Sequence, residues 1–188
     1  MPRELIITEN ITVDSVIDAT GDWFVPAGAE DPAHVAEMRE VEERLRANAD
    51  ALLIGRATFE AFRGYWPDQT DDQTGVSEYL NRVDKYVISS TLTDPDWSGT
   101  TILRGDLADE VAELKDRAGG DIVATGSITM VHALNRTRLV DEYRLFVYPV
   151  AMGSGRRLFE QPVDQTDLKL VEAHPFSSGV VLLRYRTN

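Results

Sequence analysis

The sequence predicts a single α/β domain over residues 1–188, with a mixed, mostly parallel sheet flanked by helices and a C-terminal antiparallel hairpin. Three observations support this fold class. Short apolar strand segments alternate with helical segments through most of the chain, which is typical of parallel connections. Two strand segments near the C-terminus are separated by a tight turn. A chain of 188 residues with 43% hydrophobic residues is long enough to bury one core.

The sequence of the first half of the chain predicts a strand, a helix, a strand and a second helix. The opening strand is rich in β-branched residues at 5–8 and 11–17. Asp31 followed by Pro32 is typical of a helix N-cap and first helical position, and apolar residues at a spacing near 3.6 follow. The apolar run Ala51–Ile54 predicts the next strand, and a helical pattern begins directly after it.

The second half continues this alternation after a surface excursion over residues 63–81, which has a short helical pattern near 76–80. The predicted elements that follow are strands at 85–88 and 100–103, a helix capped by Asp106, a strand at 121–124, a helix at 128–134, a strand at 143–150, and an antiparallel pair at 168–173 and 180–185. The parallel part of the sheet is therefore expected to come first.

Composition excludes several functions. Lys and Arg total 19 against 32 for Asp and Glu, and the resulting field repels nucleic acid and anionic lipid, so neither is expected as a partner. No segment has the length of a membrane span or the pattern of a secretion signal, which predicts a cytoplasmic protein. The chain has no cysteine, and its three histidines are widely spaced, so no metal site is expected. His34 and His132 are predicted to lie on helix surfaces.

Small or hydroxylated residues follow three predicted strands, and these strand ends are the candidate ligand site. They are Gly55-Arg56-Ala57-Thr58, Ser89-Ser90-Thr91 and Gly126-Ser127. Ligands bind beyond the carboxyl ends of parallel strands, and a glycine before a helix N-terminus lets the backbone approach a phosphate. The alternative is that such turns favour Gly and Ser for their geometry alone.

Arg56 and the hydroxyl residues favour NADPH over NADH as the ligand. A guanidinium is suited to forked recognition of a phosphate, although a surface ion pair is the alternative role. The turn at 89–91 lacks the carboxylate that binds a ribose diol, so its hydroxyls, with an arginine nearby, suit a 2′-phosphate. Asp94 and Asp96 follow a few residues later, and such carboxylates favour NADH instead.

Four segments in order carry a family resemblance, namely LLIGRATFEAF, KYVISSTL, DIVATGSITMVHAL and LVDEYRLFVYPVAMGSGRRLF. They resemble the dihydrofolate reductase superfamily, and most closely its riboflavin-biosynthesis reductase branch, which is RibD C-terminal domain-like. The resemblance spans essentially the whole chain. It implies a dihydrofolate reductase-like fold, NADPH lying across the strand ends, a homodimer, and hydride transfer to an aminopyrimidine of riboflavin biosynthesis or to a pterin-like substrate.

The resemblance also implies roles for individual residues. Cofactor contacts fall on Gly55, Arg56 and Thr58 for the phosphates, on Ser89, Ser90 and Thr91 for the 2′-phosphate, and on Gly126, Ser127 and Ile128 for the pyrophosphate. Substrate contacts fall on Asp22, Trp23, Gly153 and Gly155. Asp14 is expected from it to line the nicotinamide and substrate cavity. On this mechanism the proton comes from water or from a carboxylate, Asp14 or Asp31, although Asp31 is also suited to helix capping.

The sequence departs from this family at Ser15, where many members have glycine. Two other functions remain open at this point. One is a stand-alone reductase of another small carbonyl or imine compound. The other is a non-catalytic nucleotide-binding protein on the same scaffold. Turnover of NADPH on a substrate panel distinguishes them.

Overall fold

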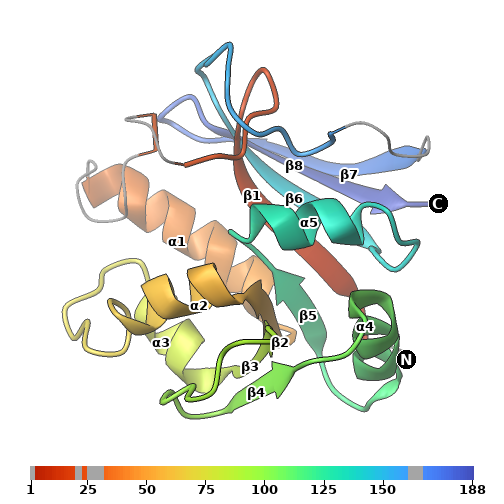
Figure 1. The fold of residues 1–188 in the computed structure, drawn as a ribbon. Coiled ribbons are helices and arrows are strands. Elements are labelled where there is room, and N and C mark those ends of the chain that lie inside the picture. Colours follow the sequence, from red (N-terminus) through yellow and green to blue (C-terminus); the bar gives the residue numbers. More distant parts are fainter. Residues whose placement is uncertain (1–2, 20–22, 25–31, 161–166) are drawn as a thin grey trace.

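The computed structural model describes residues 3–19, 23–24, 32–160 and 167–188 (Figure 1). The strands within these residues are β1 (Leu5–Thr12), β2 (Ala49–Gly55), β3 (Asp84–Ile88), β4 (Thr100–Leu103), β5 (Asp121–Ala124), β6 (Glu142–Tyr148), β7 (Leu168–Pro175) and β8 (Val181–Thr187). The helices are α1 (Pro32–Arg46), α2 (Arg56–Arg63), α3 (Val76–Arg82), α4 (Leu107–Asp116) and α5 (Ile128–Leu134).

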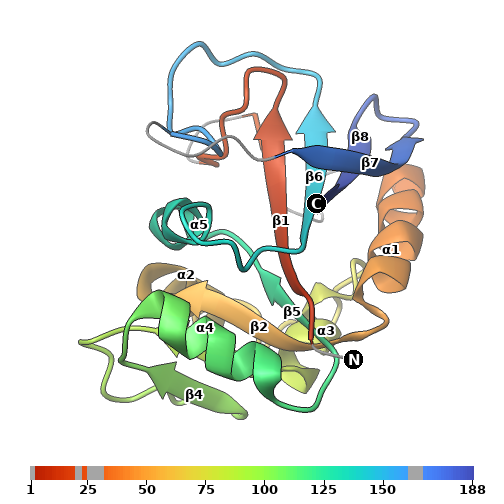
Figure 2. The same ribbon diagram turned by 90° about the vertical axis from the view of Figure 1, so that its right-hand side faces the viewer.

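The strands form one twisted sheet in the order β4-β3-β2-β5-β1-β6-β8-β7 (Figures 1 and 2). Neighbouring strands from β4 to β6 run parallel. The two C-terminal strands, β7 and β8, pair with each other and with β6 in antiparallel fashion. The predicted mixed, mostly parallel sheet with a C-terminal antiparallel pair is therefore confirmed.

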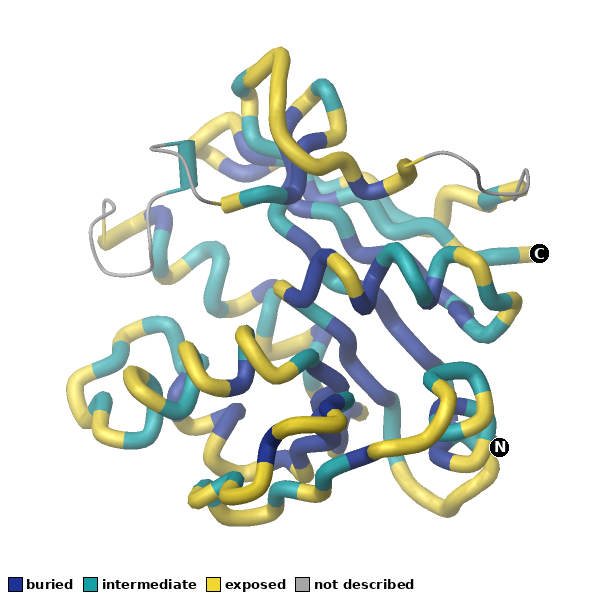
Figure 3. The backbone as a smooth tube through the Cα atoms, viewed as in Figure 1, coloured by how far each residue is buried: buried dark blue, intermediate teal, exposed yellow. Residues whose placement is uncertain are grey.

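The hydrophobic core has a part on each face of the sheet, because successive side chains along the central strands point to opposite faces and both faces are covered. Ile7 and Leu53 pack with α4 and α5 on one face. Leu52 and Ile54 pack on the opposite face against α3 and against Phe59 of α2. Helix α1 covers β6 and β8. The central strands are the most deeply buried segments in Figure 3.

The strand β1 ends earlier than the sequence predicts. Its regular pairing stops at Thr12, whose carbonyl accepts a hydrogen bond from the backbone N–H of Ser15 at 2.9 Å. Ser15 has φ 70°, the left-handed conformation that glycine adopts without cost. Val16 then forms an isolated antiparallel bridge with Arg157. The chain therefore turns within the segment 11–17 that was predicted to be continuous strand, and Ser15 takes the backbone shape of the glycine it replaces.

The crossover connections lead to opposite sides at the centre of the sheet, and this reversal creates a crevice. From β1 the chain crosses through α1 to β2, whereas from β5 it crosses through α5 to β6 on the other side of β1. The strands β1 and β5 pair only from Leu5 to Ile7, so β1 continues beyond the end of β5. Parallel sheets bind ligands at such switch points.

Two histidines lie deeper than predicted. His34 is 7% exposed, and its ring stands perpendicular to that of Phe176 at a centroid distance of 6.3 Å. His132 is half-buried, and its Nε2 lies 2.7 Å from the carbonyl oxygen of Arg157. The helix-surface prediction is wrong for His34, because β7 and the turn after it cover α1 at this point. In the described ranges, no helix combines the length and apolar character required to cross a membrane.

Candidate active site

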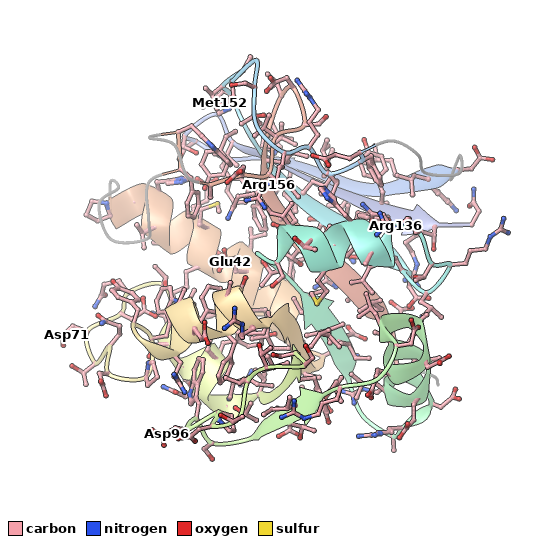
Figure 4. The ribbon with its side chains drawn as sticks, in the orientation of Figure 1. Glu42, Asp71, Asp96, Arg136, Met152 and Arg156 are labelled. Atoms are coloured by element: carbon pink, nitrogen blue, oxygen red, sulfur yellow. The ribbon has the colours of Figure 1, made fainter. Side chains whose placement is uncertain are left out.

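A cavity of about 1210 Å³ lies at the switch point, beside the middle of β1 and at the carboxyl ends of β2 and β5. Its walls come from α1, α2, α5 and the segment that follows β6. Figure 4 marks two of the lining residues, Glu42 of α1 and Arg156 of the segment after β6. Binding pockets for small ligands typically measure about 300–1,000 Å³, so this cavity accommodates a ligand larger than a single ring.

Hydrogen bonds join two of the predicted ligand turns at the edge of the cavity. The hydroxyl of Ser127 accepts a hydrogen bond from the backbone N–H of Gly55 at 2.7 Å and donates to Thr58 Oγ1 at 2.8 Å. Thr58 Oγ1 in turn donates to the carbonyl oxygen of Gly126 at 3.1 Å. Gly126 has φ 67°, and a Cβ on it would lie 3.2 Å from Thr58 Cγ2. The turn before α2 and the turn before α5 are therefore one connected structure.

Arg56 is the first residue of α2 and lines the cavity. Its side chain is 52% exposed, and within the described residues its guanidinium pairs with the carboxylate of Glu60 at 3.7 Å, one helical turn later. Exposed pairs of this kind contribute little to stability, so this guanidinium is available to an anion. The N-cap, Gly55, has no side chain to satisfy the first amides of the helix. Positive charge and free N–H groups thus meet at one side of the cavity.

The third predicted turn, Ser89–Thr91, lies beside the cavity just beyond its lining residues. The hydroxyl of Ser89 accepts the backbone N–H of Leu92 at 2.9 Å and so shapes the turn. Arg104, at the end of β4, donates to the carbonyl oxygens of Ser90 at 2.9 Å and of Leu92 at 2.7 Å. The side chains of Ser90 and Thr91 remain exposed. This turn therefore combines two free hydroxyls with a guanidinium that the sequence did not single out.

Glu9 is a functional candidate that the sequence analysis missed. It lies on β1, is 4% exposed and lines the cavity. Its Oε1 accepts a hydrogen bond from the backbone N–H of Gly126 at 2.9 Å. Burial raises the pKa of Glu9 to about 8, and the Gly126 N–H only partly offsets this effect. A signal was present, because Glu9 is in phase with the inward residues Leu5 and Ile7 of the same strand.

The α1 wall presents a carboxyl and a guanidinium, which sequence reasoning also overlooked. Glu42 and Arg46 both line the cavity, and their charged groups approach within 3.1 Å. Burial raises the pKa of Glu42 despite the opposing effect of Arg46. The Arg46 guanidinium stands over the ring of Tyr79 at 4.9 Å. Asp31, which the sequence predicts as a proton donor, lies outside the described residues.

Asp14 lies outside the set of cavity-lining residues and braces a loop. Its carboxylate accepts hydrogen bonds from the backbone N–H groups of Met152 at 3.1 Å and Gly153 at 2.7 Å, and from the Thr12 hydroxyl at 2.5 Å. The Thr12 hydroxyl, followed by the two amides, lowers the pKa of Asp14 to about 2. The ionised carboxylate that results at neutral pH cannot donate a proton, so the structure does not favour the role expected for Asp14.

The predicted substrate glycines lie on the loop that Asp14 holds. Gly153 and Gly155 have φ values of 73° and 118°, and neither lines the cavity. A Cβ on Gly155 would lie 2.7 Å from Val16, whereas a Cβ on Gly153 would meet open space. The side chain of this loop that reaches the cavity is Arg156, which pairs with Asp18 at 2.9 Å.

Trp23 lies at the rim of the site. Its indole N–H donates to the carbonyl oxygen of Asp18 at 3.0 Å, and its ring packs edge-on against Tyr148 at 5.5 Å. Tyr148 and the adjacent Phe24 line the cavity, so Trp23 supports an aromatic edge. The other residue predicted in this segment, Asp22, lies outside the described residues.

Comparison with known proteins places the chain in a family. Residues 3–182 match the family described as the RibD C-terminal domain. The chain belongs to this family. Two curated proteins of Bacillus subtilis (strain 168) are similar to this RibD C-terminal domain protein. YyaP is 33% identical over 141 residues, which is 74% of each chain, and YwjB is 24% identical over 185 residues, which is 97% of each chain. Both are described as uncharacterised proteins.

Solved structures confirm the dihydrofolate reductase-like fold of the RibD C-terminal domain protein. A putative riboflavin biosynthesis protein from Shewanella sp. PV-4 has a TM-score of 0.70 at 18% identity, with 100% of this chain and 99% of that chain covered. A pyrimidine reductase-like protein from Corynebacterium diphtheriae has a TM-score of 0.67 at 15% identity, with 99% and 92% covered. Dihydrofolate reductase from Enterococcus faecalis, complexed with NADP(H) and RAB-propyl, has a TM-score of 0.62 at 17% identity, with 98% and 96% covered. The family match supports a reductase of the RibD or dihydrofolate reductase type.

Proposed function

We propose that this protein is an NADPH-dependent reductase that passes a hydride to a small heterocyclic substrate, either an aminopyrimidine of the riboflavin-biosynthesis type or a pterin-like compound. The observation that carries the proposal is the hydrogen bond between Gly55 and Ser127. It holds the turn before α2 and the turn before α5 together beside Arg56. The family match and the cavity at the switch point support the same conclusion.

The residues present fit a dinucleotide phosphate. The first amides of α2 and the Arg56 guanidinium suit a phosphate group, because both supply N–H donors and positive charge. The exposed hydroxyls of Ser90 and Thr91, with Arg104 behind them, suit a 2′-phosphate. Gly126 adopts its positive φ and packs closely against Thr58 because it has no side chain, and this shapes the turn that we assign to the pyrophosphate. We therefore expect a preference for NADPH over NADH.

The reduced nicotinamide supplies the hydride when it is bound, and the chain supplies orientation and electrostatics. Glu42 and Arg46 offer hydrogen-bond acceptors and donors side by side on the α1 wall. An aminopyrimidine or pterin presents ring nitrogens and amino groups along one edge, which matches this pair. Phe24, Tyr148 and other apolar side chains exclude water from the ring.

The experiment is a fluorescence titration that follows energy transfer from tryptophan to bound reduced nicotinamide. Trp66 lines the cavity and serves as a donor. We expect NADPH to bind more tightly than NADH. Arg56→Ala is expected to weaken NADPH binding by about 10-fold to 100-fold, the range for loss of a charged hydrogen bond.

Arg117→Ala is a matched control, because Arg117, the C-cap of α4, also forms an i,i+4 ion pair, with Glu113, and is 45% exposed. This control is expected to bind NADPH as the unaltered protein does. Absence of binding to both nucleotides would overturn the proposal. Equal weakening by the two substitutions would show that net charge, and no specific contact at Arg56, governs the affinity.

A further inference from the structure

Helix α5 lies beside β1 (Figure 1). Glu9 lies in the part of β1 beyond its pairing with β5, in phase with Leu5 and Ile7, which pack on the α5 face of the sheet. It is almost completely buried, yet it lines the cavity. Its carboxyl oxygen accepts the backbone N–H of Gly126, an amide of the turn that we assign to the pyrophosphate. One acidic side chain therefore forms the wall of the cavity directly at the turn where negative charge is expected to bind.

The elements that flank Glu9 carry several charged and titratable groups. Tyr143 of β6 bonds to Asn135, His132 of α5 contacts the Arg157 carbonyl and Glu160, and Arg156 pairs with Asp18. Arg56 of α2 lines the same cavity, and its exposed pair with Glu60 leaves it available to an anion. Arg144 and Glu142 of β6 pair with each other on the face that α1 covers. Burial and the Gly126 amide are the influences on the pKa of Glu9, and no charged group of the described part of the chain is among them.

We propose that the dinucleotide binds this cavity when Glu9 is protonated. At any pH at which Glu9 is ionised in the free protein, cofactor binding therefore takes up a proton at Glu9. The proposal rests on the proposed NADPH site. An ionised carboxylate and a pyrophosphate at the same turn repel each other, because Glu9 is buried and no charged group of the described residues offsets the charge of Glu9 itself. The neutral acid avoids this repulsion, and its O–H is the form that can donate a hydrogen bond or a proton into the cavity.

The test is the pH dependence of the NADPH dissociation constant between pH 7 and pH 9.5. This range lies above the second pKa of a phosphate monoester, about 6, so the charge of the nucleotide is constant. With a Glu9 pKa of about 8, the free protein is about 90% protonated at pH 7 and about 10% protonated at pH 9. We therefore expect NADPH to bind about tenfold more weakly at pH 9 than at pH 7.

Two variants and one measurement on the unaltered protein make the test specific. Glu9→Gln keeps an oxygen for the Gly126 N–H and is expected to show no pH dependence. Glu113→Gln removes an exposed carboxylate of α4 and is expected to keep the full dependence. Calorimetric titration of the unaltered protein at pH 9, in buffers with different heats of ionisation, is expected to show uptake of about 0.9 proton per NADPH.

The outcomes separate this inference from the proposed function. Failure of NADPH to bind at any pH would overturn both. Binding with no pH dependence and no proton uptake would overturn the inference and leave the NADPH site in place. Retention of the full pH dependence in Glu9→Gln would assign the proton to another group and would also overturn it. If Glu9→Gln fails to fold, the calorimetric result on the unaltered protein decides.

Discussion

Replacement of Ser127 by alanine tests whether the junction of the two turns holds the site together. The Ser127 hydroxyl belongs to a residue that is 7% exposed, and it makes two hydrogen bonds, to the Gly55 N–H and to Thr58. Alanine leaves the partly buried Gly55 N–H without its acceptor. An unsatisfied buried donor costs about 1–3 kcal/mol, so we expect the free energy of unfolding to fall by that amount. For a chain of this length, this loss corresponds to a decrease in Tm of roughly 2–12 °C.

The assay is thermal and urea denaturation followed by circular dichroism, together with NADPH titration. Ser98→Ala removes an exposed hydroxyl from the loop before β4 and serves as the control, with an expected change within about 0.5 kcal/mol. The Ser127→Ala protein is expected to be less stable and to bind NADPH more weakly, because the turn before α2 loses its link to the turn before α5. Unchanged stability together with unchanged affinity would refute the reasoning.

Two further predictions concern stability. Gly155→Ala is expected to cost about 1–3 kcal/mol more than Gly153→Ala, because both glycines have positive φ but only the Cβ at position 155 meets Val16; equal losses of Tm would contradict this packing. Glu9→Gln is expected to change how stability varies with pH. The pKa of Glu9 is raised from 4.5 to about 8 on folding, so the folded protein retains a proton that the unfolded chain releases, and the unaltered protein loses stability as pH rises from 5 to 8. Glu9→Gln should lack this loss, so at pH 8 its free energy of unfolding, measured by urea denaturation, should exceed that of the unaltered protein by on the order of a few kcal/mol, relative to their difference at pH 5. If the free energies of unfolding of the two proteins vary with pH in parallel, the raised pKa is contradicted.

The fold follows from local patterns that the sequence displays directly. Short apolar strands followed by Gly, Ser or Thr and then by a helix repeat at Gly55 and Gly126, and this repetition predicts parallel connections. The Asp106 cap is likewise local, because its carboxylate accepts the N–H of Ala108 at 2.9 Å. The same local signals place the ligand turns, since the carboxyl ends of parallel strands share one edge of the sheet.

Features that depend on distant segments were not predictable in this way. The burial of Glu9 results from the end of β5 at Ala124 and the turn at Gly126, both more than a hundred residues later. The bend after Thr12 depends on hydrogen bonds that fix a turn inside a run of strand-forming residues. The depth of His34 depends on Phe176, which lies at the other end of the chain. Periodicity indicates that Glu9 shares a face of β1 with Leu5 and Ile7, but neither it nor composition identifies the distant segments that pack there.

The central claim is hydride transfer, and isotope transfer tests it most directly. NADPH that carries deuterium at the transferable position of the nicotinamide is incubated with the protein and a panel of aminopyrimidines and pterins that includes dihydrofolate. The account predicts that one member of the panel gains one deuterium on a ring or side-chain carbon for each NADPH oxidised, and that NADH is a poorer donor. Tight binding of NADPH with no deuterium transferred to any member would contradict it and would favour a nucleotide-binding protein without catalysis.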